Sequence, residues 1–497
     1  MFDAIILNNI TSHFAKSVEL FKPEIALLIT FIAALFMDIV FKKNRNAAAY
    51  TVCVGFVVTG ILLYFQSGII ENAFINMIAI DPYSVFFKYL ILISSFGVCL
   101  MSFFSDELYM GGRKVGEYYS LITGMTLGMF LLAGATNLIM IYLAIEMMSF
   151  SSYVLAGYTK ESKRASEASL KYVIYGSVSS GIMIYGMSLL FGASGSLNFV
   201  ELATMIPNGQ VDMLPLIISG IMIIAGFGYK ISLVPFHFWT PDVYEGAPIT
   251  VTAFLSVASK IAGLAGFIRF TLVIFANDPY LNWQIVIAVL SVVTMTIGNL
   301  SAIWQSNVKR ILAFSAIAHA GYILMALVAM DKIGVASIMF YLFAYIFMNL
   351  GAFMVVMLIA NKINSEDIDD YNGVGYKMPV LGALLVIFLI SLAGIPPTAG
   401  FLGKFYIFAA VLEKGGVWVW LAVVGVLNSA ISIFYYFKIF RNMYLRGNKT
   451  ETSERFTFSP AAIILTVVFA IPTLLLLVYY SPLLEWANYS VAMLFVK

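Results

Sequence analysis

Residues 226–260 read GFGYKISLVPFHFWTPDVYEGAPITVTAFLSVASK, and the rest of the chain is organised around this stretch. It lies among segments apolar enough to cross a bilayer, yet it contains the titratable residues Lys230, His237 and Lys260. It also contains Pro235, and a proline inside a helix removes one backbone hydrogen bond and clashes with the preceding turn. In lipid, freed backbone groups are tolerated only where protein or a water-filled cavity receives them. The stretch therefore predicts a broken membrane helix beside an ion path, and hence a protein that moves protons.

The composition indicates a multi-pass membrane protein. Of 497 residues, 61% are hydrophobic and 11% are charged, and apolar runs near the length of a bilayer crossing recur throughout. The net charge of +2 is too small to indicate nucleic-acid binding. Cys53 and Cys99 stand in apolar runs without the spacing of metal ligands, which favours buried packing thiols over a metal or iron–sulfur site.

Hydropathy predicts an all-α fold with about fourteen transmembrane helices. The predicted crossings lie near residues 24–41, 48–66, 83–104, 117–134, 136–157, 166–191, 213–232, 248–274, 282–303, 309–330, 335–361, 378–411, 417–440 and 458–480. Prolines interrupt the seventh crossing at Pro235 and the twelfth within the segment SLAGIPPTAGFLGKFY, residues 391–406.

The basic residues of the loops predict the orientation. One set of alternate loops is strongly basic and, by the positive-inside rule, is expected in the cytoplasm. This set consists of Lys42, Lys43, Arg45, Arg113, Lys114, Lys160, Lys163, Arg164, Lys309, Arg310, Lys362, Lys377, Lys438, Arg441, Arg446, Lys449 and Arg455. The other set has Lys16, Lys22, Lys332, Lys414 and Lys497, with Lys88 at the edge of a crossing. Both termini are therefore expected on the outer side of the membrane.

A weak internal repeat divides the chain. Crossings four to eight, residues 117–274, match crossings nine to thirteen, residues 275–445, in layout, and each unit has one broken helix. Because five crossings is an odd number, the second copy must be inverted in the membrane, as in many transporters. Residues 1–116 then hold the first three crossings, and residues 446–497 hold the last helix.

Titratable residues inside the crossings are the candidates for proton transfer. A central lysine or acid costs on the order of 3 kcal/mol to insert, so such residues usually mark ion pathways or buried pairs. The candidates are Glu146, Lys171, Lys230, Lys260, Lys404, His237 and His319. The alternative for His237 is that it binds backbone carbonyls freed by Pro235. Arg269, near the end of a crossing, is expected to extend to the membrane surface.

These groups suggest a way to load and release protons. An ammonium loses stability in a low-dielectric site, and a nearby carboxylate restores it. We expect Glu146 to modulate Lys230 in this way and Lys260 to relay protons to Lys404. The sequence contains no P-loop, no GxGxxG after a strand and no CxxC cluster, so it offers no signal for other chemistry.

Five motifs carry a resemblance to a known family. They are LAIEMMSFSSYVLAGY (143–158), SEASLKYVIYGSVSSGI (166–182), LVPFHFWTPDVYEGAP (233–248), VKRILAFSAIAHAGY (308–322) and SLAGIPPTAGFLGKFY (391–406). These motifs resemble the antiporter-like subunits of respiratory complex I, the bacterial NADH-quinone oxidoreductase. The lysine at 404 and the residues around Trp239 are similar to the subunit N type rather than to types L and M.

The resemblance implies a function and partners. It implies a proton channel centred on Glu146, Lys230, Lys260 and Lys404, with Lys171 as a further candidate, in a chain without a redox cofactor of its own. The quinone and the electron donor are expected on other subunits, and neighbouring antiporter-like subunits are expected partners in the bilayer. The alternatives are a subunit of an Mrp-type cation/proton antiporter and a membrane anchor whose polar residues are only structural.

Overall fold

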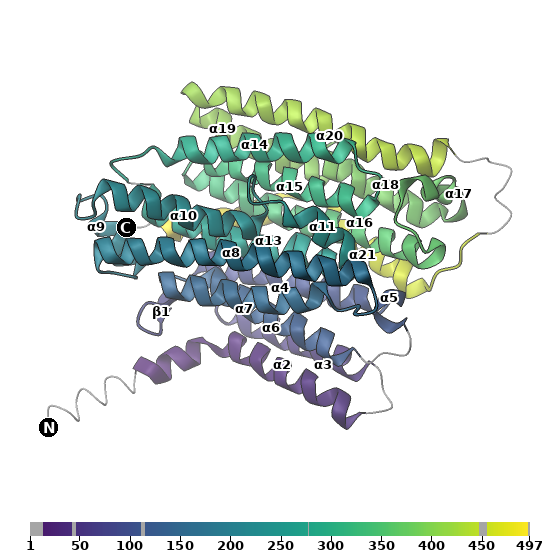
Figure 1. Cartoon of the computed structure of the whole chain (residues 1–497), viewed down its shortest axis with the longest axis horizontal. Coiled ribbons are helices and arrows are strands. Elements are labelled where there is room, and N and C mark those ends of the chain that lie inside the picture. Colours follow the sequence, from purple (N-terminus) through teal and green to yellow (C-terminus); the bar gives the residue numbers. More distant parts are fainter. Residues whose placement is uncertain (1–12, 42–45, 111–114, 277, 447–454, 496–497) are drawn as a thin grey trace.

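The computed structural model describes residues 13–41, 46–110, 115–276, 278–446 and 455–495. Long helices lie side by side along the longest axis of the molecule (Figure 1). They are α2 (Lys22–Val40), α3 (Ala47–Tyr64), α4 (Pro82–Ser102), α6 (Gly116–Gly134), α7 (Leu138–Ala156), α8 (Lys163–Ser194), α10 (Met213–Ile231), α14 (Trp283–Ile303), α15 (Val308–Leu327), α16 (Lys332–Ile363), α20 (Val419–Leu445) and α21 (Pro460–Leu475). A further continuous span consists of α12 (Ile249–Phe254), η2 (Leu255–Ser259), α13 (Lys260–Phe270) and η3 (Thr271–Phe275). The predicted all-α membrane fold is confirmed.

Shorter elements lie between and beyond these helices. They are β1 (Glu71–Ala73), β2 (Ile78–Ile80), α5 (Asp106–Tyr109), α9 (Phe199–Met205), α11 (Trp239–Gly246), η4 (Ile368–Tyr371), α17 (Val374–Lys377), α18 (Pro379–Ala393), α19 (Ala399–Lys414), η5 (Gly416–Trp418), α22 (Ser481–Ala492) and η7 (Met493–Phe495). The two strands pair with each other in antiparallel register, Glu71 opposite Ile80.

The described residues contain ten helices that are long and apolar enough to cross a membrane. An eleventh is added if the bent pair His13–Leu20 and Lys22–Met37, at 66°, counts as one span. Two shorter apolar helices, Pro379–Ala393 and Pro460–Leu475, fall below this length. Every predicted crossing overlaps a helix, but the number fourteen itself stays a prediction.

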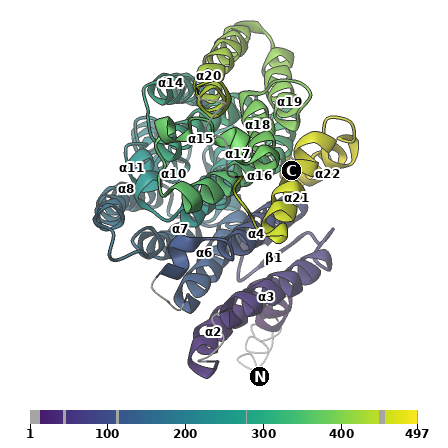
Figure 2. The ribbon, with the colours of Figure 1, turned by 90° about the vertical axis from the view of Figure 1, so that its right-hand side faces the viewer.

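The helices differ sharply in how far other helices cover them. The most apolar windows of Ile249–Phe275 and Val308–Leu327 are 100% and 94% buried, whereas those of Ala47–Tyr64 and Gly416–Leu445 are 39% and 33% buried. Seen along their axes, α15 and α16 lie in the middle of the bundle, and α2, α3 and α20 lie at its edges (Figure 2). A helix that is hydrophobic all round and buried inside protein belongs to a core. Polar residues on the central helices are therefore enclosed by protein and away from lipid.

Both predicted helix breaks are present. Helix α10 ends at Ile231 and is capped by Ser232, which has a left-handed backbone, and α11 begins at Trp239 beyond the Val234–Pro235 bond. Helix α18 ends at Ala393 and is capped by Gly394, with φ +82°, and α19 begins at Ala399. Each proposed five-helix unit thus has its break at the fourth position, whereas the inverted relation and the domain boundaries stay predictions.

The predicted orientation depends partly on residues outside the described ranges, namely Lys42, Lys43, Arg45, Arg113, Lys114, Lys449 and Lys497. One surface cavity near an end of the bundle is lined by Asn72, Lys414 and Phe495, so the hairpin, the end of α19 and the end of η7 lie close together. Which face of the membrane this end meets stays a prediction.

Candidate functional site

Lys230 lies in the last turn of α10, just before the first helix break. Its side chain is buried, and its Nζ donates a hydrogen bond to Ser149 Oγ of α7 at 3.2 Å. Glu146 lies one turn before Ser149 on α7, is half-buried and accepts a hydrogen bond from Ser180 of α8. The predicted partners Glu146 and Lys230 thus approach the same turn of α7, but they form no ion pair within 4.0 Å.

A glycine makes room for this lysine. A Cβ at Gly263 of α13 would lie 3.5 Å from Lys230 Cγ and 3.1 Å from Ile231 Cγ1. The second distance is shorter than ordinary van der Waals contact, so a larger residue would press on the end of α10. Gly263 therefore lets the Lys230 stem pass close to α13, the helix that carries Lys260.

Lys260 begins α13 directly after the π-helical turn η2. Single π-helical turns within α-helices frequently occur at functional sites. The buried Lys260 amine donates a hydrogen bond to the main-chain carbonyl of Ala316 on α15. A backbone carbonyl is neutral, so this contact leaves the charge of an ammonium uncompensated.

His319 lies one turn after Ala316 on α15, between two phenols. Its Nδ1 is hydrogen-bonded to the Tyr341 hydroxyl of α16, and its Nε2 lies 3.1 Å from the Tyr436 hydroxyl of α20. The Tyr436 hydroxyl also shares a hydrogen bond with Ser315. Neutral imidazole donates at one nitrogen and accepts at the other, so this arrangement can pass a proton through the ring.

Lys404 lies in α19 just beyond the second helix break. Its Nζ donates to the Ala393 carbonyl at 2.9 Å and to Ser429 Oγ of α20 at 3.0 Å. It also lies 4.7 Å above the ring of Tyr322, which is one turn after His319 on α15. Because Gly394 lacks a Cβ, which would be only 2.6 Å from Lys404 Cδ, the amine can reach the end of α18.

Together, Lys230, Lys260, His319 and Lys404 are called the buried basic row. None of its three lysines lies within 4.0 Å of a described carboxylate. Other buried lysines are paired. Lys88 lies 2.6 Å from Glu24, with side chains 0% and 1% exposed, and Lys309 lies 2.8 Å from Glu366. Neutral partners therefore distinguish the row from other buried lysines of the same chain.

Comparison with known proteins places the chain in a family. Residues 135–432, which include the whole row, match the family described as NADH:quinone oxidoreductase/Mrp antiporter, TM. A relative from Chloroherpeton thalassium, named NADH-quinone oxidoreductase subunit N 2, is 46% identical over 95% of this chain and 94% of its own length. The chain belongs to the NADH-quinone oxidoreductase subunit N family.

Solved structures agree with this assignment. A chain of respiratory complex I from Thermus thermophilus is 28% identical, with a TM-score of 0.78 over 94% of this chain and 99% of that one. A chain of the Mrp complex from Dietzia sp. has a TM-score of 0.81 over 96% of this chain and 98% of its own, at 20% identity. The second likeness shows a shared fold alone. The membership agrees with the fold, and the five motifs, which lie between residues 143 and 406, fall within the matched residues 135–432.

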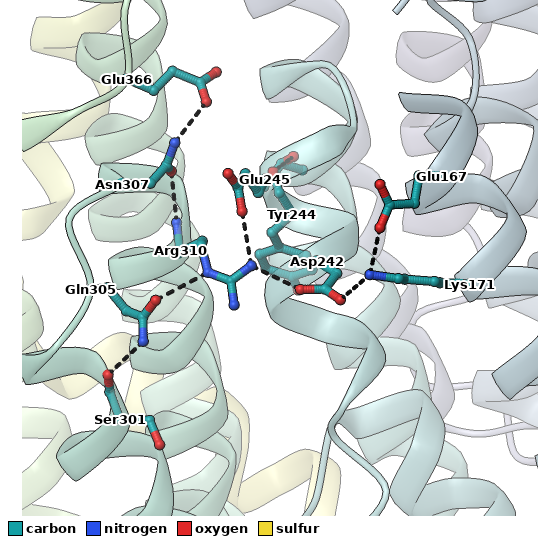
Figure 3. A network of polar contacts seen from close by, with 11 residues as sticks. Glu167, Lys171, Asp242, Tyr244, Glu245, Ser301, Gln305, Asn307, Arg310 and Glu366 are labelled. Atoms are coloured by element: carbon teal, nitrogen blue, oxygen red, sulfur yellow. Dashed lines mark hydrogen bonds and ion pairs between the residues drawn. The ribbon is translucent and has the colours of Figure 1, made fainter. Parts of the chain in front are cut away.

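In this chain, Lys171 lies apart from the buried basic row. Its side chain is 38% exposed and contacts Glu167 and Asp242, each at 2.7 Å. Arg310 of α15 contacts Asp242 and Glu245 of α11, each at 2.8 Å (Figure 3). We call these five residues the charged network. The structure does not bring Lys171 together with the row, and its part in proton transfer stays a prediction.

The charged network has ordinary electrostatics. Burial alone raises the pKa of the Asp242 carboxyl, but hydrogen bonds from Lys171 and Arg310 outweigh burial and hold this pKa below its usual range. Asp242 is therefore ionised at neutral pH and joins α8 and α15 to the short helix α11.

His237 lies between α10 and α11 and is also outside the row. It is buried, its ring lies 4.6 Å from that of Phe238, and its Nδ1 has no hydrogen-bond partner among the described residues. It therefore sits at the break, as expected, and its role in proton transfer stays a prediction.

The prediction for Arg269 is wrong. Its side chain is buried and does not extend outward, because Asp81, the cap of α4, pairs with it at 2.7 and 3.0 Å, and the Tyr83 ring lies beneath it at 4.7 Å. Lys88, predicted at the edge of a crossing, lies in the second turn of α4 in the buried pair with Glu24. Partners far away in the sequence compensate both charges, and no local pattern identifies them.

The described residues contain no group of three or more His, Cys, Asp or Glu side chains that could hold a metal ion. The expectation that this chain carries no redox cofactor stays a prediction.

Proposed function

We propose that the chain is a proton-translocating membrane subunit of a respiratory NADH (or other donor):quinone oxidoreductase. It couples quinone reduction, performed by other subunits, to proton movement through the buried basic row and Glu146. One observation carries this proposal: Lys230, Lys260 and Lys404 are buried and bonded only to neutral groups. An apolar residue would fill each of these positions at a lower free energy, because burying an uncompensated charge costs several kcal/mol.

The first half of the path consists of Glu146 and Lys230. At about 4 Å and an effective dielectric near 20, a carboxylate stabilises an ammonium by roughly 4 kcal/mol. Lys230 is bonded to Ser149, one turn from Glu146, so a small movement exchanges a neutral partner for a charged one. Such a movement loads the amine with a proton, and its reversal releases the proton. A conformational change driven by quinone reduction then needs only to move Lys230 between Ser149 and Glu146.

The second half of the path follows α15. Within two turns of this helix, the Ala316 carbonyl accepts a hydrogen bond from Lys260, and His319 contacts two phenols. The ring of Tyr322 lies beneath the Lys404 amine. We propose that a proton released by Lys260 passes through His319 and its tyrosines to Lys404. Rearrangement of side chains, or water, completes the transfer between these groups.

The test uses the intact complex in proteoliposomes. Quinone reductase activity and proton uptake into the vesicles are measured together for Glu146→Gln and Lys230→Met. Both variants should lose most of the proton uptake per quinone reduced while the complex assembles normally. The matched control is the double variant Lys88→Met with Glu24→Gln, which removes a buried lysine and its partner outside the row. Normal uptake in both Glu146→Gln and Lys230→Met would refute the proposal.

An Mrp-type cation/proton antiporter subunit is the alternative, since the matching family covers both kinds of protein. The naming of the 46% identical relative favours the oxidoreductase. Sodium transport by the purified complex without quinone turnover would favour the antiporter.

The same proposal implies which molecules surround the chain and in which membrane it lies. We infer that other membrane subunits, including neighbouring antiporter-like subunits, and lipid cover the exposed apolar side chains of α2, α3, α8 and α20. The quinone and electron donor bind elsewhere in the complex. The location is a bacterial inner membrane, with both termini on the outer side.

A further inference from the structure

Two thiols meet where α3 packs against α4. Cys53 Sγ and Cys99 Sγ lie 3.5 Å apart, although the residues are 46 positions apart in the sequence, and both are free. The sequence predicted separate packing thiols, and the structure shows a pair. We propose that this pair is a modification site, at which a hydroperoxide joins Cys53 to Cys99 in a disulfide inside the membrane.

Helix packing holds the two sulfurs in register. Seven residues after Cys53 on α3 is Gly60, and seven residues before Cys99 on α4 is Leu92. A Cβ at Gly60 would lie 3.4 Å from Leu92 Cδ2, and the hydroxyl of Tyr89 donates to the Gly60 carbonyl at 3.3 Å. Equal steps in opposite directions are expected of two antiparallel helices in contact. The thiols therefore face each other because of the main-chain arrangement and not through one chance rotamer.

The distance suits disulfide formation. A disulfide requires sulfurs about 2.05 Å apart, so the pair must close by roughly 1.5 Å, which rotation about the side-chain bonds can supply. A structural metal site commonly needs four ligands. The described residues offer no group of three or more His, Cys, Asp or Glu side chains, so the pair does not belong to such a site.

The two thiols differ in access, which assigns their roles. Cys99 is fully buried, whereas Cys53 is half-buried on α3, next to the 63% exposed Val54. A thiol that reacts first must be reached by the oxidant, and the second thiol must be adjacent to it. Cys53 is reached from the lipid side, and Cys99 is adjacent but shielded.

The reaction balances with a hydroperoxide as the oxidant. Cys53 sulfur attacks the terminal peroxide oxygen, the O–O bond breaks, and the products are a sulfenic acid and an alcohol, whose oxygen takes up the proton that the Cys53 thiol loses. Cys99 sulfur then attacks the Cys53 sulfur, the S–O bond breaks, and water leaves with the Cys99 proton. The two sulfurs together lose two electrons, and the peroxide bond accepts them. The product fastens α3, at the edge of the bundle, to α4 (Figure 2).

The test treats the intact complex in membranes with cumene hydroperoxide. The protein is then unfolded in detergent, so that burial does not protect thiols, labelled with N-ethylmaleimide and digested without reduction for mass spectrometry. We expect both cysteines to lose label in equal amounts, a linked Cys53–Cys99 peptide to form, and dithiothreitol to restore both labels. Oxidation of the exposed Met213, 52% accessible, verifies the peroxide dose.

Two variants make the outcome decisive. In Cys53→Ser, Cys99 should keep its label after peroxide, because the remaining thiol is fully buried and the oxidant does not reach it. In Cys99→Ser, Cys53 should proceed to sulfinic acid, because no partner traps the sulfenic acid. Unchanged labels in the unmodified protein at a dose that oxidises Met213 would overturn the proposal. So would sulfinic acid at Cys53 beside a fully labelled Cys99. These readouts are masses, so they do not depend on proton translocation.

Discussion

The buried basic row and the charged network use the same kinds of side chain in opposite ways. In the network, Lys171 and Arg310 each have two carboxylates at 2.7–2.8 Å, and all these side chains are partly exposed. In the row, Lys230, Lys260 and Lys404 are buried and have hydroxyls or carbonyls as partners. Carboxylates compensate both cations of the network, whereas no described carboxylate compensates a lysine of the row.

The partners of a lysine determine how much free energy a change of its protonation state costs. A lysine with two fixed carboxylates holds its proton through any rearrangement that keeps those contacts. A lysine with neutral partners in a low dielectric responds strongly when one charge moves by a few ångströms. We therefore expect the row, and not the network, to take part in proton transfer, and the following variants test that contrast.

The largest effect is expected from giving a row lysine a permanent carboxylate. Ser429→Asp places an acid beside Lys404, whose Nζ lies 3.0 Å from Ser429 Oγ. At about 4 Å and an effective dielectric near 20, the attraction between a carboxylate and an ammonium is roughly 4 kcal/mol, so Lys404 should keep its proton. Proton uptake per quinone reduced, measured in proteoliposomes, should fall at least about tenfold.

Ser429→Asn is the matched control, since it changes the size in the same way without adding a charge. It should pump much better than Ser429→Asp. Equal rates in the two variants would show that charge at Lys404 does not matter, and the contrast between row and network would fail.

An intermediate effect is expected from moving Lys404 without changing any charge. In Gly394→Ala, the new Cβ would lie 2.6 Å from Lys404 Cδ and must displace the lysine stem. The left-handed backbone adds about 1–2 kcal/mol of strain for any residue with a Cβ. Proton uptake should fall several-fold, and assembly, checked by size-exclusion chromatography, should persist.

Gly195→Ala controls for backbone strain. Gly195 ends α8 with φ +73° and has open space around its Cβ position. It should show the strain without the loss of proton uptake. A similar loss in both variants would attribute the Gly394 effect to strain alone.

The helix breaks and the row were predictable for a physical reason. Prolines at 235, 396 and 397 cannot continue a helix, and lysines inside apolar runs are costly wherever they point. Each of these signals depends only on neighbouring residues in the sequence, so it can be recognised without the structure. The break positions and the burial of Lys230, Lys260 and Lys404 followed from them.

Partners were not predictable because they come from distant segments. Asp242 lies 71 positions from Lys171, and Asp81 lies 188 positions from Arg269. Without these partners, Lys171 looked like a row residue and Arg269 like a surface residue. The Cys53–Cys99 contact was missed for the same reason. The burial of a side chain can be inferred from its own segment of sequence. The residue that compensates its charge can be identified only when the folded structure shows which segments meet.

A smaller effect on pumping is expected from the network. Asp242→Asn removes the carboxylate shared by Lys171 and Arg310. Because these groups are about one-third exposed and partly screened by solvent, the loss of stability should be about 1 kcal/mol. The thermal unfolding temperature of the purified complex should fall slightly, and added salt should reduce the difference. Proton uptake should stay far above that of Ser429→Asp. If Asp242→Asn stops pumping in a folded complex, Lys171 belongs to the path after all.

The smallest effect concerns pH, because the stability contributed by Asp242 should not depend on it near neutrality. Its pKa in the folded protein lies below the usual value, since hydrogen bonds from Lys171 and Arg310 outweigh burial. A lowered pKa gives stability that is complete above the unfolded value of about 3.9 and is lost as pH falls through the folded value. The difference in unfolding temperature between the unmodified protein and Asp242→Asn should therefore stay constant between about pH 6 and 8. A difference that changes within that window would mean that Asp242 exchanges its proton near neutrality, as a row group would, and the network would then share the chemistry of the row.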